Sequence, residues 1–486
     1  MSKERISYWG KIILLMLLFL GVGYRINYAV DTYWTFMEGF DKAASDMLTR
    51  NGRPVIALMY KLFALTHLKN ELFYYISFVM AFVLLGLAVA LYEKILRLYI
   101  ARENLRLICS LLCIVNLYAI EYFMFLEKGG FALAIFCNVL AVWYINTYLQ
   151  EHKPISMLGA VLSILIATLT YQGTIPLFFI LSLPIIYKKA STLVDYIKNF
   201  MILVVVYWIP MGIDLALFNI AFDSSRNSTG NGLVQGISEA WNTILYSYQT
   251  TYSLTKRYLY LGFLCLTIVI NLVSIFNKKT DIVKSILNII VIFIVLTVLP
   301  VASIIGSTGW GTPRIIYPMA SGIGIFAVNY YVNHHDKEAD YDRLCNQTIY
   351  VLCLFFTAVQ FVAYTRVYID KYKMNYADYV RIQEIGQAID EYEMSTGNKI
   401  EQIAFYRDHN HDNPYYANLY YEGDLVVSAF HNWDSQLNAI NYYLGTNYRR
   451  CYTESTYQAY FDQLDWHCYS PMQIICDYDT LHYCVY

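Results

Sequence analysis

The stretch KIILLMLLFLGVG, residues 11–23, is a single lysine followed by an unbroken apolar run. About 20 such residues, coiled as a helix, cross the roughly 30 Å hydrocarbon core of a bilayer. The run extends from Gly10 to about Tyr28 and therefore predicts a first membrane span. Its basic start, with Lys3 and Arg5, would also suit a cleaved signal peptide. No small-x-small cleavage site follows and further apolar runs do, which favours an uncleaved helix.

Apolar runs of this kind recur along most of the chain and bring the number of candidate spans to 11. The others centre on residues 71–91, 107–125, 131–149, 155–171, 174–187, 200–221, 258–276, 284–305, 314–332 and 346–364. Overall 57% of the residues are hydrophobic and 15% are charged, whereas a soluble domain carries about 25% charged residues. The net charge of −2 gives no reason to expect nucleic acid as a partner.

The basic residues predict the orientation, because lysine and arginine concentrate in cytoplasmic loops. Short basic loops follow every second candidate span, at residues 92–106, 150–154, 187–199, 277–283 and 333–345, and so all fall on the same side of the membrane. We therefore expect a cytoplasmic N-terminus and, after an odd number of spans, an extracytoplasmic C-terminus. This divides the chain into a transmembrane domain at 1–365, with an outer loop at 29–70, and an extracytoplasmic domain at 366–486.

The tail differs in composition from the rest, being rich in tyrosine, aspartate, asparagine and histidine. Apolar residues at helical spacing predict a helix over 376–393. The sequences KIEQIAFY (399–406), DLVVSAF (424–430) and MQIIC (472–476) are typical of strands. Helices are expected near 434–443 and 454–465. The tail is therefore expected to form a small α/β domain.

Four cysteines lie in this tail: Cys451, Cys468, Cys476 and Cys484. In an extracytoplasmic domain they could form two disulfides in one of three connectivities. A zinc site involving His467 is the alternative, but the tail contains no C-x2-C pair. Disulfides or free thiols are favoured over zinc.

The first outer loop contains the sequence YAVDTYWTFMEGFDKAASDMLTRNGRPVIALMYKLF, residues 28–63. Asp31 comes just after the first span, at the expected membrane–water boundary, where a carboxylate could take the proton of a hydroxyl. Arg53, in NGRP, could bind a phosphate through bidentate hydrogen bonds. The alternative is an amphipathic helix on the membrane surface with its acids facing water.

Two further segments place functional side chains at the expected outer edge. Glu127 follows an apolar span in EYFMFLEKGG, and ionisable residues at such depth are candidates for function. The alternatives are an ordinary helix end and a competing acid, Glu121. Tyr171 and Gln172, in YQG, lie between two spans and could bind sugar hydroxyls or simply form a tight turn.

The loop GSTGWGTPR, residues 306–314, is rich in glycine and contains Trp310 and Arg314. Glycine lets a backbone approach a phosphate closely, and arginine could pair with that phosphate. A flexible turn with a boundary arginine is the alternative for this loop taken alone.

Taken in order, Asp31 and the motifs NGRPV, FLEKGG, TYQG and PRIIYP resemble the glucosyltransferase-II family of bacterial membrane glucosyltransferases. The resemblance spans roughly residues 25–330. The family belongs to the GT-C class of polytopic transferases, which implies a GT-C-like helical membrane fold in the bacterial cytoplasmic membrane. It also implies transfer of a sugar, usually glucose, from a polyprenyl phosphate donor to an O-antigen, cell-wall or other surface glycan.

The resemblance implies seven site residues. It assigns catalysis to Asp31 and Glu127, donor phosphate binding to Arg53 and Arg314, and sugar binding to Tyr171, Gln172 and Trp310. No D-x-D motif occurs in the first outer loop, and arginine can neutralise a lipid monophosphate, so neither a metal nor another cofactor is expected.

The chain departs from the family at two places. Thr32 follows Asp31 where a second acid is common, and Lys128 and Gly129 follow Glu127 where an asparagine is usual. These departures bear on the identity of the catalytic base and of the sugar.

Two other classes of function fit the same composition. A transporter or flippase for lipid-linked sugars would carry ionisable residues deep within its spans, whereas the candidate spans here are almost free of them, with Asp214 as the main exception. A non-catalytic scaffold that binds wall polymer would not need the acids of the first outer loop. The transferase is the favoured hypothesis.

Overall fold

The computed structural model describes residues 3–25, 27–221, 233–276, 282–306, 311–333, 340–407, 421, 424–431, 433–463 and 470–485. Contacts divide the chain into two compact units. The first comprises Met1–Tyr24 and Ala43–Arg366, and the second Arg25–Lys42 and Val367–Tyr486. Residues 29–42, predicted to belong to an outer loop of the transmembrane domain, and residues 25–28, predicted to end the first span, thus group with the C-terminal segment.

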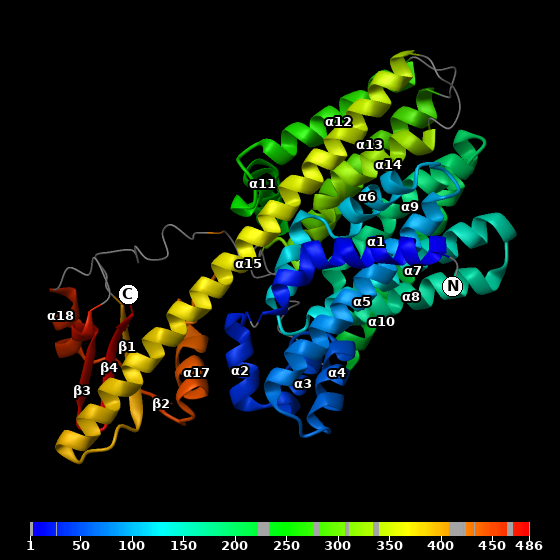
Figure 1. The fold of residues 1–486 in the computed structure, drawn as a ribbon. Helices are drawn as coiled ribbons and strands as arrows, with labels where there is room; N and C mark the ends of the chain where they lie inside the picture. The colour runs from blue at the N-terminus through cyan, green and yellow to red at the C-terminus, as the bar shows by residue number, and fades with distance from the viewer. Residues whose placement is uncertain are drawn as a thin grey trace. The chain divides into compact units, whose positions relative to one another are not determined.

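The first unit is built from helices (Figure 1). They are α1 (Lys3–Leu20), η1 (Gly21–Tyr24), most of α3 (Phe40–Thr49), α4 (Pro54–Ala64), α5 (Asn70–Leu96), α6 (Glu103–Ile114), η2 (Leu117–Met124), α7 (Lys128–Glu151), α8 (Pro154–Thr170), η3 (Gln172–Thr174), α9 (Pro176–Lys189), α10 (Leu193–Ala221), α11 (Leu233–Thr250), η5 (Thr251–Ser253), α12 (Leu259–Phe276), α13 (Ile282–Gly306), η6 (Tyr317–Ser321), α14 (Gly322–Asn333) and the first part of α15 (Asp340–Thr396).

Six helical segments in the described part are long and apolar enough to cross a membrane. They are Ile6–Tyr24, Asn70–Leu96, Lys128–Glu151, Leu193–Leu217, Ile282–Ile305 and Arg343–Thr396. A seventh is possible if the pair α6 and η2, bent by 56°, forms one broken span. Two of the other runs predicted as spans form shorter apolar helices, Pro154–Thr170 and Leu259–Ile275. The helices are consistent with a helical membrane protein, while the count of 11 spans and the GT-C fold stay predictions.

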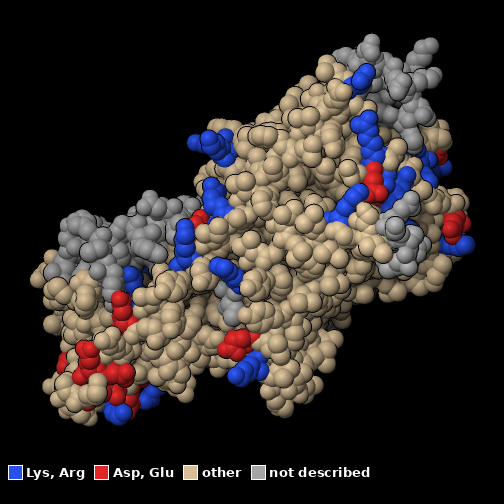
Figure 2. All heavy atoms as spheres, in the orientation of Figure 1, with Lys and Arg blue, Asp and Glu red and all other residues tan. Residues whose placement is uncertain are grey.

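The surfaces of these helices are apolar where a soluble protein would be polar. On α1, for example, Ile13, Leu14, Leu17 and Leu18 are all exposed. Figure 2 shows broad areas over the helical part with neither acidic nor basic side chains. Exposed apolar area of this extent marks a surface that something other than water covers, as a lipid bilayer would.

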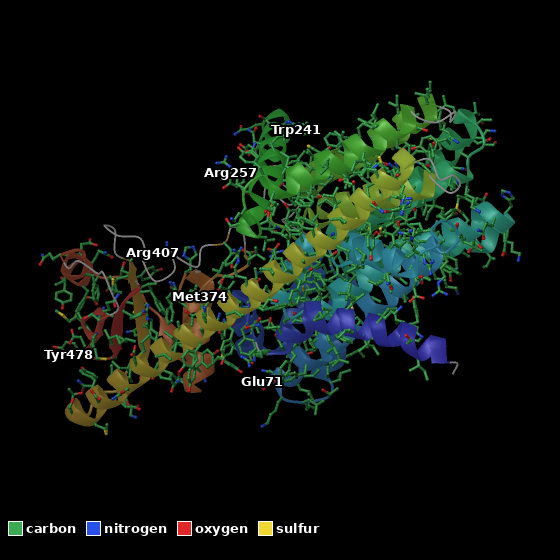
Figure 3. The ribbon with its side chains drawn as sticks, turned by 45° about the horizontal axis from the view of Figure 1, so that its top comes forward. Glu71, Trp241, Arg257, Met374, Arg407 and Tyr478 are labelled. Carbon is green, nitrogen blue, oxygen red and sulfur yellow. The ribbon has the colours of Figure 1, made fainter. Side chains whose placement is uncertain are left out.

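The second unit is a small α/β unit around a four-stranded sheet. Its elements are α2 (Val30–Glu38), the last part of α15, β1 (Gln402–Arg407), α17 (Trp433–Leu444), β2 (Arg449–Arg450), α18 (Ser455–Asp462), η7 (Pro471–Gln473), β3 (Ile474–Asp477) and β4 (Thr480–Val485). The strand order is β2-β1-β4-β3. β1 is parallel to both β2 and β4, and β3 is antiparallel to β4. Tyr478, in the turn between β3 and β4, is 76% exposed (Figure 3).

Aromatic packing explains why residues 25–42 belong to this unit. α2 packs against α17, with the ring of Phe36 5.4 Å from that of Tyr442. The Tyr33 hydroxyl lies 3.2 Å from that of Tyr443. Asn375 of α15 hydrogen-bonds both backbone groups of Tyr28. These are contacts between residues more than 300 positions apart, which no local pattern predicts.

The expected elements of the tail are confirmed with one exception. The helix over 376–393 is the end of α15, and the strands at 399–406 and 472–476 correspond to β1 and β3. The strand predicted at 424–430 is wrong, because this segment forms turns. The buried Asp378 carboxylate accepts hydrogen bonds from Ser428 Oγ (2.6 Å) and Ala429 N–H (2.8 Å), which replaces strand pairing.

Candidate active site

Arg53 comes immediately before α4, where Pro54 occupies the first helical position, as is common for proline. Gly52 has φ of +65°, and this turn lets Arg53 N–H donate to Met47 O at 2.8 Å. The guanidinium lies over the ring of Tyr171, 4.6 Å from its centroid, a favourable cation–π geometry. Its Nε is buried and has no hydrogen-bond partner among the described residues.

Tyr171 and Gln172 connect α8 to η3. Tyr171 has an extended backbone, with φ −163° and ψ 109°, which ends α8. Its ring is buried. The Gln172 side-chain amide donates to Gly52 O at 3.4 Å and to Asp214 Oδ2 at 3.2 Å. The two residues predicted to bind sugar therefore lie beside the arginine predicted to bind phosphate.

Asp214 is the carboxylate of this group. It lies on α10, four residues after Pro210, and is 4% exposed. Oδ1 is buried and has no hydrogen-bond partner in the described part of the chain. The sequence shows Asp214 only as an acid within an apolar run; its contact with Gln172 spans 42 positions and comes from the tertiary structure. We call Arg53, Tyr171, Gln172 and Asp214 the Arg53 cluster.

Arg314 has a carboxylate partner of its own. Its guanidinium lies 3.1 Å from Glu121 Oε1, and its backbone N–H donates to the same carboxylate. The Glu121 side chain is completely buried and that of Arg314 is 17% exposed. The Arg314 guanidinium also lies 4.3 Å from the centroid of the Phe125 ring. The charge of Arg314 is therefore already balanced in the structure.

Aromatic packing joins the Arg53 cluster to this ion pair. The Tyr171 ring contacts Phe131 (centroids 4.8 Å apart) and Tyr122 (5.7 Å). The Tyr122 hydroxyl donates to Arg314 O at 2.7 Å. Gly173 is needed at this junction, since a Cβ there would lie 2.6 Å from Tyr171 Cε1 and 3.2 Å from Arg314 O. Four of the seven predicted site residues, Arg53, Tyr171, Gln172 and Arg314, thus lie in one region.

Glu127 and Lys128 lie at the start of α7. Glu127 is 7% exposed, and no described residue hydrogen-bonds its carboxylate. Lys128 is buried with Nζ 3.3 Å from the centroid of the Tyr74 ring. Gly129 allows close packing here, because a Cβ at this position would lie 3.0 Å from Ser77 O. No contact within hydrogen-bond distance joins Glu127 to the described members of the Arg53 cluster.

The remaining predicted residues lie elsewhere. Asp31 is exposed, in the first turn of α2, and belongs to the second unit. There it contributes negative charge near Lys371, whose Nζ donates to Val427 O at 2.9 Å. Trp310 lies outside the described residues. The two residues predicted as catalytic, Asp31 and Glu127, thus belong to different units.

Among the described residues, no group of three or more His, Cys, Asp and Glu side chains is placed to hold a metal ion. Cys451 and Cys476 carry free thiols, while His467 and Cys468 lie outside the described residues. Comparison of the sequence with protein-family models and with curated proteins finds no match.

Proposed function

We propose that the chain is a membrane glycosyltransferase that moves a sugar, expected to be glucose, from a polyprenyl phosphate donor to a surface glycan. On this proposal it works in the bacterial cytoplasmic membrane, with the reaction on the extracytoplasmic face. The observation that carries the proposal is the Arg53 cluster. Arg53, whose Nε is buried without a hydrogen-bond partner among the described residues, meets there the consecutive residues Tyr171 and Gln172 from a distant segment of the chain.

Each member suits one requirement of the reaction. The leaving group is a lipid phosphate, and a guanidinium held in a fixed orientation can stabilise its growing negative charge. The Tyr171 ring fixes the plane of the Arg53 guanidinium, leaving N–H groups available for phosphate oxygens. The side-chain oxygen of Gln172 can accept from sugar hydroxyls, while its NH2 group donates to Gly52 O and Asp214 Oδ2. Arg314, balanced by Glu121, would share its guanidinium between that carboxylate and the donor phosphate.

The proposal is tested by replacing Arg53. Purified protein in proteoliposomes is given decaprenyl phosphate [14C]glucose and envelope glycan isolated from cells that lack the gene. Arg53→Gln should lower transfer by about 10²–10³-fold, the usual effect of removing one donor that stabilises transition-state charge. Arg50→Gln is the matched control, since the Arg50 side chain is 75% exposed and pairs only weakly, at 3.7 Å, with Asp46.

Mass spectrometry of surface glycans provides the cellular readout. Cells without the gene should lack a hexose branch, and wild-type chain but not Arg53→Gln should restore it. An unchanged glycan profile with an altered distribution of lipid-linked sugar across the membrane would refute the transferase and support transport.

A further inference from the structure

Asp214 combines three features that set it apart from the other acids of the first unit. It is 4% exposed, its Oδ2 accepts the Gln172 amide at 3.2 Å, and its Oδ1 is buried without a partner among the described residues. We propose that Asp214 binds the acceptor hydroxyl and takes its proton, acting as the general base of the transfer. This inference rests on the proposed function and deepens it.

Burial of a carboxylate oxygen without a hydrogen bond is unfavourable, so such a group requires an explanation, and a catalytic role is one of those known. The partner that Oδ1 requires is a donor, because an ionised carboxylate only accepts. A sugar hydroxyl is such a donor. Gln172, by holding Oδ2, fixes the orientation in which Oδ1 would meet it.

The surrounding charges support a substrate site over a structural ion pair. Arg53 and Asp214 both lie next to the Tyr171–Gln172 dipeptide, one over the ring and the other on the amide. Yet these two described side chains form no ion pair with each other. A cation and an anion held on the same dipeptide without pairing can act on two different groups. In the transfer these are the donor phosphate and the acceptor hydroxyl.

The other acids are less well placed within this unit. Glu121 is engaged by Arg314 through two donors. Glu127 makes no hydrogen bond to the described members of the Arg53 cluster. Among the described acids, Asp214 has a hydrogen bond to a predicted sugar-binding residue, Gln172.

The acceptor oxygen forms a new bond to C1 of the donor sugar while its proton moves to Oδ1 of Asp214. The bond from C1 to the phosphate oxygen breaks, and its electron pair stays on the phosphate, which leaves as polyprenyl phosphate beside Arg53. Asp214 then loses the proton to water, which restores the carboxylate.

The test is Asp214→Asn in the proteoliposome assay with decaprenyl phosphate [14C]glucose and isolated envelope glycan. Asparagine can still accept the Gln172 amide but cannot take a proton. We expect kcat to fall by about 10²–10⁴-fold, the usual contribution of a general base, with KM for the donor little changed. The small residual rate should lose the acid limb of the wild-type pH profile. Asp195→Asn, near the N-terminal end of the same helix, is the matched control and should leave kcat unchanged.

Several outcomes would overturn the assignment. Asp214→Asn activity within about threefold of wild type refutes it while the proposed function stands. A rise in KM with unchanged kcat would make Asp214 a binding residue and also refute it. If Asp214→Asn does not accumulate in cells, Gln172→Met is tested in its place. This variant keeps the Asp214 carboxylate but removes the hydrogen bond that orients it. A kcat equal to that of the wild type in Gln172→Met would contradict the proposal. A wild-type chain with no transferase activity refutes the proposed function itself.

Discussion

Replacing Arg314 with methionine should destabilise the first unit strongly, because it leaves the Glu121 carboxylate buried without its cation. At 3.1 Å two unit charges attract by about 5 kcal/mol at an effective dielectric constant of 20. Part of this is offset by the desolvation of both ions, and the Arg314 backbone N–H, which the variant keeps, still donates to Glu121. Breaking a buried pair from one side costs about 3–5 kcal/mol, so we expect a loss of about 3 kcal/mol.

A double variant at Glu121 and Arg314 distinguishes the loss of the ion pair from other effects of replacing Arg314. Glu121→Gln combined with Arg314→Met removes both charges while Gln still accepts the backbone N–H. It should recover most of the loss and lie within about 1.5 kcal/mol of wild type, as uncharged replacements of buried ion pairs often do.

The assay is equilibrium unfolding of the purified chain in mixed micelles, titrated with a denaturing detergent. Arg314→Met within about 1 kcal/mol of wild type would mean that the pair is effectively solvated. A double variant that costs the sum of the two single losses would show that Glu121 and Arg314 are not energetically coupled. Either result would refute the reasoning.

Three further predictions concern other parts of the chain. Burial lowers the pKa of His482, so between the folded and unfolded pKa values the unfolded state binds more protons than the folded state. The free energy of unfolding of the second unit should therefore be highest above about pH 6.5, the ordinary pKa of histidine. It should decrease as the pH falls below that value towards the lowered pKa of His482 in the folded state. His482→Gln should flatten this dependence in unfolding titrations between about pH 5 and 8, and an unchanged slope would exclude His482 as its source. Gly129→Ala should lower the free energy of unfolding by about 1–3 kcal/mol through overpacking, because the new Cβ would lie 3.0 Å from Ser77 O. Gly262→Ala is the control and should not destabilise the chain, because no atom lies within 4 Å of a Cβ at that position. Equal thermal midpoints for the two variants would contradict this prediction. Lys128→Met should leave stability unchanged or raise it, because the buried Nζ has no hydrogen-bond partner among the described residues, and a lower thermal midpoint would show that the amino group stabilises the fold.

The sequence by itself determines the helical membrane character of the chain. Apolar runs such as residues 70–96 are long enough to span a bilayer because helix length depends on local composition. The end of α15 and strand β1 follow from local periodicity in the same way. The strand expected at 424–430 fails because this segment forms turns, in which the buried side chain of Asp378 accepts hydrogen bonds from Ser428 Oγ and Ala429 N–H. No pattern within the segment contains that information.

The candidate site shows the same division. Motifs in the sequence predict Arg53, Tyr171, Gln172 and Arg314 as site residues, since arginine, aromatic and amide side chains are recognisable at the ends of apolar runs. Only the tertiary structure places Asp214 on Gln172, pairs Glu121 with Arg314, and groups residues 25–42 with the C-terminal segment. These are contacts between residues 42 to several hundred positions apart, and they depend on how helices pack. Local composition determines where a helix forms, but packing determines which of its polar side chains meet.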